Sequence, residues 1–130
     1  MDATTHQVLY IEDNDANALL FKRIFQRLPT MSLTIIATGA EGLEFVRREK
    51  PRLVLLDLHL PGISGEEVLR AIRADETLSG CAVIIVTGDA ALDTRARMEA
   101  LGASMTLTKP IKVQQLIAAV EHALEIEVAS

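Results

Sequence analysis

The sequence Leu-Val-Leu-Leu-Asp-Leu-His-Leu-Pro-Gly at residues 53–62 places four consecutive apolar residues directly before one carboxylate. A short apolar run that is closed by breakers such as Pro61 and Gly62 predicts a strand buried on both faces, as in a parallel sheet. Asp57 would then lie at the carboxyl end of that strand, where open α/β sheets place their ligand sites. Because burying an unpaired charge is costly, we expect Asp57 to be paired, bound to a metal or used chemically.

The composition of the 130-residue chain bounds the class of protein. Apolar residues make up 49%, which is enough for one domain over residues 1–130, with its core at about 7–126. The net charge of −5 and the aromatic content of 3% argue against a nucleic-acid partner or an acidic membrane surface. Cys81 is the only cysteine, which excludes an internal disulfide. No apolar run reaches about 18 residues, and residues 1–7 lack the Lys or Arg of a signal peptide, so we expect a cytoplasmic protein.

Hydrophobic periodicity divides the chain into alternating strands and helices. Predicted strands occupy residues 7–11, 33–37, 53–57, 81–86 and 103–107. Predicted helices cover residues 14–28, a segment from about 39 to 50, a segment between Ser64 and a polar loop at 75–80, a segment from 89 to about 101, and a segment from about 112 to 126. Thr38 with Glu41 and Ser64 with Glu67 have the spacing of capping boxes, and Asp89 is the expected cap of the fourth helix.

This alternation predicts an α/β fold in which five helices cover both faces of a five-stranded parallel sheet. Right-handed crossovers favour the flavodoxin-like, doubly wound strand order 2-1-3-4-5, whose switch point lies between the first and third strands. Polar residues follow four of the strands: Glu12 and Asp13, Asp57, Thr87, and Thr108 with Lys109. The carboxyl ends of parallel strands share one edge of the sheet, so these residues are expected to converge there.

The chemistry of this predicted cluster suits phosphoryl transfer. Two unit charges at ~4 Å repel by about 4 kcal/mol at an effective dielectric of about 20, so Glu12, Asp13 and Asp57 need a positive partner. Mg²⁺, a hard cation with oxygen ligands, and the Lys109 ammonium would provide one. With the Thr87 hydroxyl, they would support transfer of a phosphoryl group to Asp57. Taken singly, the residues have simpler explanations: a helix cap for the acidic pair, a strand end for the threonine and a solvated loop for the lysine.

Four motifs in this order resemble the receiver domain of two-component response regulators, in particular its chemotaxis-regulator-like single-domain members. They are Val-Leu-Tyr-Ile-Glu-Asp-Asn at 8–14, Leu-Val-Leu-Leu-Asp-Leu-His-Leu-Pro-Gly-Ile-Ser-Gly at 53–65, Ile-Ile-Val-Thr-Gly at 84–88 and Thr-Lys-Pro at 108–110. The resemblance runs from Val8 to about Leu124, which is nearly the whole chain.

The resemblance implies that Asp57 is phosphorylated by a histidine kinase or a histidine phosphotransfer protein. Glu12, Asp13, Asp57 and the backbone carbonyl of His59 would hold Mg²⁺, for which Mn²⁺ can substitute. Thr87 and Lys109 would contact the phosphoryl group. The protein would assist its own phosphorylation and dephosphorylation without being an enzyme.

One position departs from the family pattern. Receivers of this type often carry an aromatic switch residue three positions before the lysine, and here that position is Thr106. An aromatic ring that swings inward cannot operate in this chain. We therefore expect a smaller rearrangement of the loop from Thr87 to Ala91 to carry the signal.

Two further positions flank the expected phosphoryl group. His59 lies two residues after Asp57, and Asp89 lies two residues after Thr87. The family resemblance implies that such positions tune the access of water, and we expect the two side chains to pair across the site and modulate dephosphorylation. The alternative is that both are solvated loop residues.

The expected partner surfaces also follow from the resemblance. Kinases and phosphotransfer proteins would dock beside the first helix and the loop after the fifth strand, on Asn14, Asp15, Asn17, Ala18, Phe21 and Pro110. Phe21 is equally compatible with a place in the core. A downstream protein or a second copy would use the fourth helix, fifth strand and fifth helix, where Arg95, Gln115, Ala119 and His122 lie, and the chain is expected to be a monomer or weak dimer.

The leading prediction is a phosphoaccepting switch in a phosphorelay, with no DNA-binding output domain in the chain. One alternative is the receiver fragment of a hybrid histidine kinase. Another is a Mg²⁺-dependent phosphohydrolase with an aspartyl-phosphate intermediate, but such enzymes need an acidic residue where His59 stands, and the chain has no cap insertion. A degenerate receiver that only binds partners is disfavoured, because Glu12, Asp13, Asp57, Thr87 and Lys109 are all present.

Overall fold

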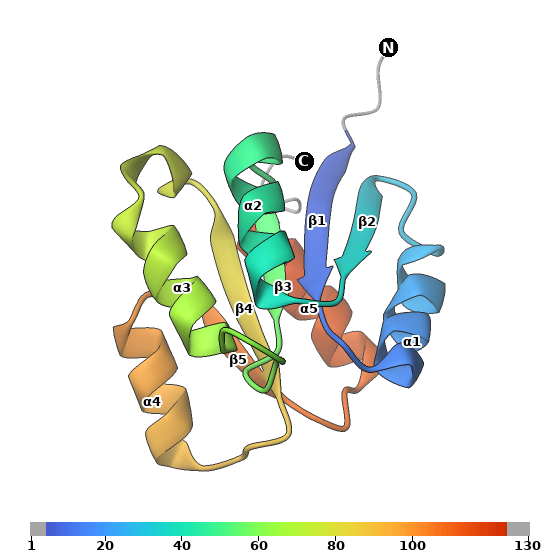
Figure 1. Ribbon diagram of the computed structural model, residues 1–130. Coiled ribbons are helices and arrows are strands. Elements are labelled where there is room, and N and C mark those ends of the chain that lie inside the picture. Colours follow the sequence, from blue (N-terminus) through green and yellow to red (C-terminus); the bar gives the residue numbers. More distant parts are fainter. Residues whose placement is uncertain (1–4, 125–130) are drawn as a thin grey trace.

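The computed structural model describes residues 5–124, in which one parallel sheet lies between two layers of helices (Figure 1). Five strands alternate with five α-helices and one short 3₁₀ helix. In chain order they are β1 (His6–Ile11), α1 (Asp15–Phe25), β2 (Met31–Ile36), α2 (Gly39–Glu49), β3 (Leu53–Leu56), α3 (Gly65–Ala74), η1 (Glu76–Leu78), β4 (Ala82–Thr87), α4 (Leu92–Ala100), β5 (Met105–Thr108) and α5 (Val113–Leu124). The predicted alternation is confirmed, and the expected residues 125 and 126 of the last helix lie outside the described part.

The strand order is β2-β1-β3-β4-β5, as predicted, and all neighbouring strands are parallel. β3 lies at the centre, where Leu56 pairs with Ile11 of β1 and Ile85 of β4. All four residues of β3 are fully buried, which explains why this strand is continuously apolar rather than alternating. Asp57 therefore directly follows the carboxyl end of the central, fully buried strand.

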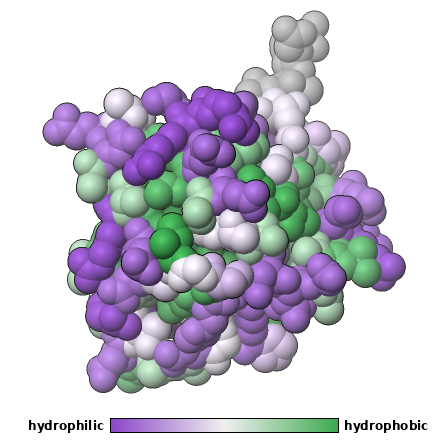
Figure 2. Space-filling view, viewed as in Figure 1, coloured by the Kyte–Doolittle hydropathy of each residue, from purple (hydrophilic) through white to green (hydrophobic). Residues whose placement is uncertain are grey.

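Two hydrophobic layers cover the sheet. Side chains that alternate along each strand enter opposite layers: Leu9 of β1 packs with α2, α3 and α4, whereas Val8 packs with α1 and α5. In Figure 2, hydrophilic residues cover the outer sides of the helices on the viewed face, and hydrophobic residues show between them. None of the helices among residues 5–124 is long and apolar enough to cross a membrane.

Both predicted capping boxes start a helix, although only one is reciprocal. The Ser64 side chain accepts from the Glu67 amide, and the Glu67 carboxylate accepts from the Ser64 amide, so α3 has a complete capping box. At α2 the Thr38 hydroxyl accepts from the Glu41 amide and donates to the Glu41 side chain. These caps fix the first turns of α2 and α3, the helices before and after β3.

Several elements differ in extent from prediction: β2 begins at Met31 rather than residue 33, and β5 begins at Met105 rather than residue 103. α1 ends at Phe25 rather than residue 28, because the amides of Arg27 and Leu28 bond to carbonyls three residues back and tighten the turn before Pro29. The expected polar loop at 75–80 contains η1, which buries Leu78. α4 begins at Leu92, three residues after its expected cap.

Candidate functional site

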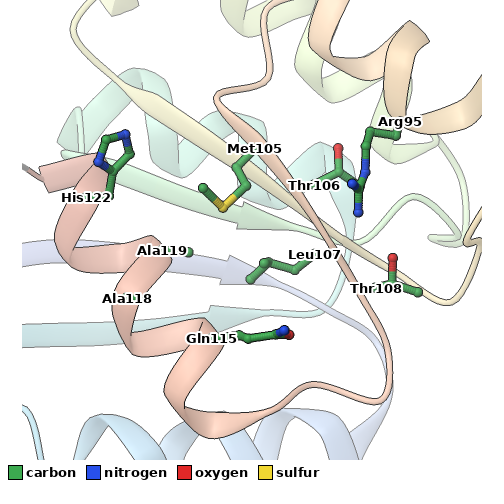
Figure 3. A pocket seen from close by; sticks show the side chains of 9 residues that line it. All are labelled: Arg95, Met105, Thr106, Leu107, Thr108, Gln115, Ala118, Ala119 and His122. Carbon is green, nitrogen blue, oxygen red and sulfur yellow. The ribbon is translucent and has the colours of Figure 1, made fainter. Parts of the chain in front are cut away.

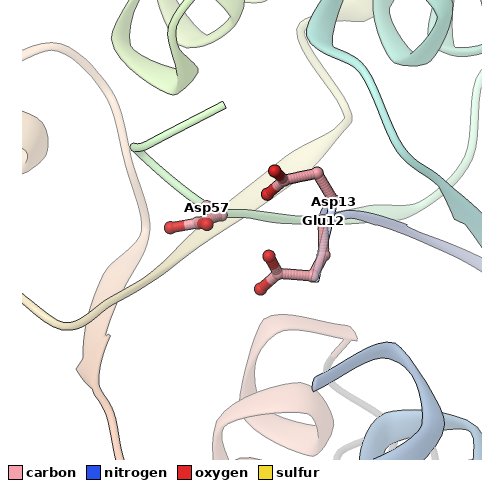
Figure 4. Close-up of side chains that lie close together, drawn as sticks. All are labelled: Glu12, Asp13 and Asp57. Atoms are coloured by element: carbon pink, nitrogen blue, oxygen red, sulfur yellow. The ribbon is translucent and has the colours of Figure 1, made fainter. Parts of the chain in front are cut away.

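Three carboxylates converge at the edge of the sheet where β1 and β3 end, the lower edge in Figure 1. Oxygens of Glu12, Asp13 and Asp57 all lie within 4.8 Å of one another. Figure 4 shows the side chains of Glu12 and Asp13 reaching from the end of β1 toward Asp57. Glu12 and Asp57 are buried, whereas Asp13 is exposed. The predicted acidic cluster therefore forms, with one carboxylate open to solvent.

These side chains line an open cleft of about 630 Å³, which we call the carboxylate cleft. Its residues come from the β1–α1 loop, the β3–α3 loop, the β4–α4 loop and the end of β5. They are Glu12, Asp13, Asn14, Asp15, Ala16, Asn17, Asp57, His59, Gly88 and Lys109. The cleft spans the switch point between β1 and β3, as the strand order requires.

Glu12 is held by four hydrogen-bond donors. Its Oε1 accepts from Tyr10 Oη at 2.8 Å, Lys109 Nζ at 2.9 Å and Asn17 Nδ2 at 3.3 Å, and its Oε2 accepts from the Asn14 amide at 3.1 Å. Burial alone would raise the pKa of Glu12, but the bonds from Lys109 and Tyr10 outweigh it and lower the pKa. Glu12 is thus a fixed, ionised carboxylate.

Asp57 is less well compensated. Burial and the nearby charge of Glu12 raise its pKa, against the weaker opposing effects of Lys109 and the His59 amide. Lys109 Nζ is 3.7 Å from Asp57 Oδ2, and the His59 amide is 3.4 Å from Asp57 Oδ1. Asp57 is therefore a carboxylate that additional positive charge would stabilise.

The acidic cluster fits a divalent cation. Asp57, a buried carboxylate with a raised pKa, lies close enough to buried Glu12 and exposed Asp13 for one ion to contact all three. Hard cations such as Mg²⁺ bind one or two carboxylates and keep several waters, which the exposed side at Asp13 can accommodate. Glu12, Asp13 and Asp57 are the residues that could hold the ion.

Gly65 brings the start of α3 against the backbone of Asp57. A Cβ at residue 65 would collide with the carbonyl oxygen of Asp57 and the Cα of Leu58, and the Gly65 amide bonds to the Leu58 carbonyl. The absence of a side chain thus allows the β3–α3 loop to fold tightly behind the acidic cluster.

Thr87 ends β4 with its side chain fully buried. Its Oγ1 accepts from the Asp89 amide at 3.1 Å, and its carbonyl accepts from the Lys109 amide. Thr87 and Lys109 are therefore linked through the backbone at the junction of β4 and β5, as their predicted positions at two strand ends imply.

Asp89 does not cap α4, so that prediction is wrong. Its Oδ1 accepts from the Ala91 amide at 2.9 Å, and its Oδ2 accepts from the Thr94 hydroxyl at 2.8 Å, while Ala91 occupies the cap position with no side-chain bond. A carboxylate two residues before the cap can close the loop on itself and still reach the first turn of the helix.

The expected pairing of His59 with Asp89 takes a weaker form. No hydrogen bond or ion pair joins these two residues, both of which the structure describes. The Ala91 amide is the main cause that lowers the pKa of Asp89, and the nearby His59 contributes a smaller effect in the same direction. The Asp89 carboxylate is occupied by its own loop.

Phe21 belongs to the core and does not present a docking side chain. It is 1% exposed, and its ring stacks on Tyr10 with centroids 4.1 Å apart. The other proposed docking residues are partly or fully exposed: Asn14, Asp15, Asn17, Ala18 and Pro110. Asn14 has a further role, since its side chain accepts from the Asn17 amide and caps α1.

Thr106 is buried on β5, and its hydroxyl has no hydrogen-bond partner within residues 5–124. It lines a second concavity, of about 640 Å³, which we call the β5 groove and which Figure 3 shows. The groove is lined by Arg95, Met105, Thr106, Leu107, Thr108, Gln115, Ala118, Ala119 and His122. All four residues expected on the output face therefore line one surface.

Sequence reasoning missed two residues that organise the site. Tyr10 donates to Glu12, and Thr94 anchors Asp89. Tyr10 could have been found, because residues two apart in a strand share a face and Tyr10 stands two before Glu12. Thr94 carries no such signal, because its role depends on where α4 begins.

Comparison with known proteins gives consistent matches. Residues 8–121 match the family described as "Response regulator receiver domain". The polar-differentiation response regulator DivK of Brucella ovis is 32% identical over 120 residues, which cover 92% of this chain and 97% of DivK.

Two solved structures share the fold. A CheY-like response regulator receiver domain protein from Methanospirillum hungatei has 27% identity and a TM-score of 0.84, covering 97% of this chain and 98% of that one. The receiver domain of a sensor histidine kinase from Pseudomonas aeruginosa, crystallised with a magnesium ion in its active site cleft, has 24% identity and a TM-score of 0.85 over 94% and 99% of the two chains.

Proposed function

The chain belongs to the family of response regulator receiver domains, and we propose that it accepts one phosphoryl group on Asp57 from a phosphohistidine donor. The placement of Asp57 carries the proposal: it is a buried carboxylate, 3.7 Å from Lys109 and within 4.8 Å of Glu12 and Asp13. The donor is a histidine kinase or a histidine phosphotransfer protein. Receiver domains are signalling domains, and this one would act through contacts with other proteins.

In the transfer, an Asp57 carboxylate oxygen forms a bond to phosphorus as the phosphorus–nitrogen bond of the donor breaks. The electron pair of that bond goes to the imidazole nitrogen. Lys109 lies close enough to Asp57 Oδ2 to donate hydrogen bonds to the oxygens of the new phosphoryl group. The Thr87 hydroxyl would turn to donate to one of the same oxygens.

Glu12, Asp13, Asp57 and the backbone carbonyl of His59 would hold Mg²⁺, or Mn²⁺ in its place. When bound, the ion supplies positive charge that neutralises the oxygens of the transferring group. The raised pKa of Asp57 supports this assignment, since it marks a carboxylate whose ionisation lacks sufficient positive charge nearby.

The signal would leave the site through the β4–α4 loop. The Thr87 hydroxyl accepts from the Asp89 amide, and Asp89 in turn accepts from Thr94 of α4. When Thr87 turns toward the phosphoryl group, this chain of bonds would rearrange and reposition α4. Because position 106 has no aromatic ring, we expect Thr106→Tyr to change partner binding and the spectral response to phosphorylation; no change would exclude position 106 from the switch.

His59 and Asp89 would modulate the lifetime of the phosphoryl group by limiting the access of water to it. His59 lines the carboxylate cleft, and Asp89 directly follows Gly88, which lines it as well. We expect His59→Ala and Asp89→Ala to alter the dephosphorylation rate measured by intact mass, and an unchanged lifetime in both would remove this role.

Partners would use two surfaces. The kinase or phosphotransfer protein would dock on Asn14, Asn17, Ala18 and Pro110 beside the carboxylate cleft, while a downstream protein would use the β5 groove. We further propose a cytoplasmic protein, a monomer or weak dimer, whose receiver domain spans residues 1–130. His59 in place of an acidic residue supports the switch over a phosphohydrolase.

The test is the intact mass of the protein after incubation with acetyl phosphate or a phosphoramidate and Mg²⁺. We expect one phosphoryl group on the wild type and none on Asp57→Ala or on a sample with chelator. If no adduct appears, beryllofluoride binding read by NMR distinguishes rapid hydrolysis from lack of acceptance. Absence of both responses would refute the proposed function.

A further inference from the structure

Tyr10 is a buried polar residue that bonds to Glu12, one of the residues lining the carboxylate cleft. Its phenol oxygen donates to Glu12 Oε1 at 2.8 Å, and its side chain has no exposure to solvent. Its ring stacks on Phe21 with an interplanar angle of 20°. The stack and the surrounding core fix the ring, so the hydroxyl is held on Glu12.

Glu12 Oε1 also accepts from Lys109 at 2.9 Å, whereas Lys109 is 3.7 Å from Asp57. In this structure Lys109 is therefore bonded mainly to Glu12. We expect a contact between Lys109 and a phosphoryl group on Asp57 to weaken that bond, because the ammonium would then divide its donors between two charged acceptors.

The departure of Lys109 has a physical cost. The Glu12 side chain is 1% exposed, and a buried carboxylate that loses its cation is strongly destabilised unless other donors remain. Two such donors are Asn17, whose bond of 3.3 Å is long and only partly buried, and the Asn14 amide, which bonds to the other oxygen, Oε2, at 3.1 Å. Tyr10 provides the shorter and fully buried bond to Oε1, the oxygen that Lys109 bonds.

We propose that Tyr10 is a positioning residue that keeps Glu12 fixed and hydrogen-bonded while Lys109 transfers to the phosphoryl group. This inference rests on the proposed function of Asp57. Tyr10 acts through Glu12 and Lys109 and does not touch the reacting atoms. It lowers the cost of the phosphorylated state relative to the resting state, because its bond persists when the bond from Lys109 does not.

Tyr10→Phe tests the proposal, because it removes the hydroxyl and preserves the ring stack. We expect the dissociation constant for beryllofluoride, measured by NMR titration with Mg²⁺ present, to rise about tenfold, since hydrogen bonds to charged groups are among the stronger ones. The dissociation constant for Mg²⁺ alone should stay within about twofold, because Lys109 can remain on Glu12. A purely structural role would not separate the two constants.

Ile72→Val is the matched control for lost stability, since Ile72 is a buried residue of α3 away from the cleft. It should lower the unfolding midpoint and leave both dissociation constants unchanged. Equal beryllofluoride affinity in Tyr10→Phe and wild type would overturn the inference about Tyr10 but leave the proposed function intact. A wild type that neither binds beryllofluoride nor accepts a phosphoryl group would overturn the proposed function as well.

A second measurement covers the case in which Tyr10→Phe does not fold. The chain has one tyrosine and no tryptophan, so 3-fluorotyrosine labels Tyr10 alone. Its hydroxyl is more acidic and donates more strongly, so we expect beryllofluoride to bind about twofold more tightly, with a ¹⁹F shift on binding. Weaker or unchanged binding, or a ¹⁹F resonance that ignores beryllofluoride, would overturn the inference.

Discussion

The carboxylate cleft and the β5 groove have nearly equal volumes, about 630 and 640 Å³, but they are built in opposite ways. In the cleft, buried Glu12 receives four hydrogen bonds and Asp57 lies beside a lysine. In the groove, the buried hydroxyl of Thr106 has no partner in the described part of the chain. The polar groups of the cleft are therefore paired with one another, whereas the groove contains a buried hydroxyl that the described residues leave unpaired.

The largest expected effect breaks the organisation of the cleft. Lys109→Ala leaves Glu12 buried without its cation and should lower the free energy of unfolding by about 3 kcal/mol in urea denaturation at pH 7. The folded pKa of Glu12 lies below its ordinary value of 4.5, so its ionisation stabilises the protein above pH 4.5 and this contribution is lost as the pH falls through the folded value. The difference between variant and wild type should therefore narrow in acid.

Lys112→Ala is the matched control for this prediction, because Lys112 is an exposed lysine in the same β5–α5 segment. It should unfold like the wild type across the same pH range. Equal stability of Lys109→Ala and Lys112→Ala at pH 7 would contradict the assigned ion pair.

Gly65→Ala distorts the cleft from behind. The new Cβ would overlap the carbonyl oxygen of Asp57, so we expect a loss of about 2 kcal/mol in urea denaturation and a reduced yield of phosphoryl adduct by intact mass. Gly80→Ala is the comparison, since nothing lies within 4 Å of a Cβ there. Matching behaviour of the two variants would mean that α3 shifts without disturbing Asp57.

Asp57→Asn should have the opposite sign and stabilise the protein. The folded pKa of Asp57 lies above its ordinary value of 3.8, so the contribution of this one group to stability is fully present below pH 3.8 and is lost as the pH rises through the folded value. The neutral amide avoids that loss, and we expect a gain of about 1 kcal/mol at pH 7 without divalent cation, measured by thermal unfolding. Mg²⁺ should then stabilise the wild type more than the variant.

Asp75→Asn is the control for the stabilisation expected of Asp57→Asn. Hydrogen bonds from Thr77 lower the pKa of Asp75, so removing its charge should not stabilise the protein. A gain in both variants would indicate a general effect of net charge rather than a property of the cleft.

The smallest effect is expected in the groove. Thr106→Val replaces an unpartnered hydroxyl by a methyl group and should change the free energy of unfolding by about 0.5 kcal/mol or less, or raise it slightly. Thr87→Val makes the same replacement at the end of β4, next to Gly88 of the cleft, where the hydroxyl accepts from the Asp89 amide, and should cost about 1 kcal/mol. Similar losses in urea denaturation would remove the distinction between the two regions.

The fold and the acidic cluster were predictable because both follow from the ends of strands. An apolar run that stops at Asp57, and another that stops before Glu12, place the two residues at one edge once the sheet is parallel. The contacts between side chains were harder to predict from the sequence. The hydrophobic periodicity of α1 does not decide whether Phe21 faces the core or the solvent. The burial of Phe21 depends on the ring of Tyr10, on which it stacks.

The role of Asp89 shows a second limit. An aspartate shortly before a helix predicts a cap, but the Asp89 carboxylate bonds to the Ala91 amide and the Thr94 hydroxyl instead. The choice between these arrangements depends on a single turn of backbone, which local sequence does not determine. The short helix η1 was missed for a similar reason, since its polar composition conceals the one buried side chain of Leu78.

The way in which α4 is attached has a consequence for local unfolding. Only Thr94 and Met98 of this helix are buried, its first turn has no side-chain cap, and Arg97 ties it to Glu66 of α3 by an exposed ion pair. Amides of α4 should therefore exchange with deuterium sooner than those of α5, which buries Leu116, Ala119, Val120 and Leu124. A helix that opens at low free energy can be repositioned by the modest energy of a single modified side chain, while the sheet beneath it stays folded.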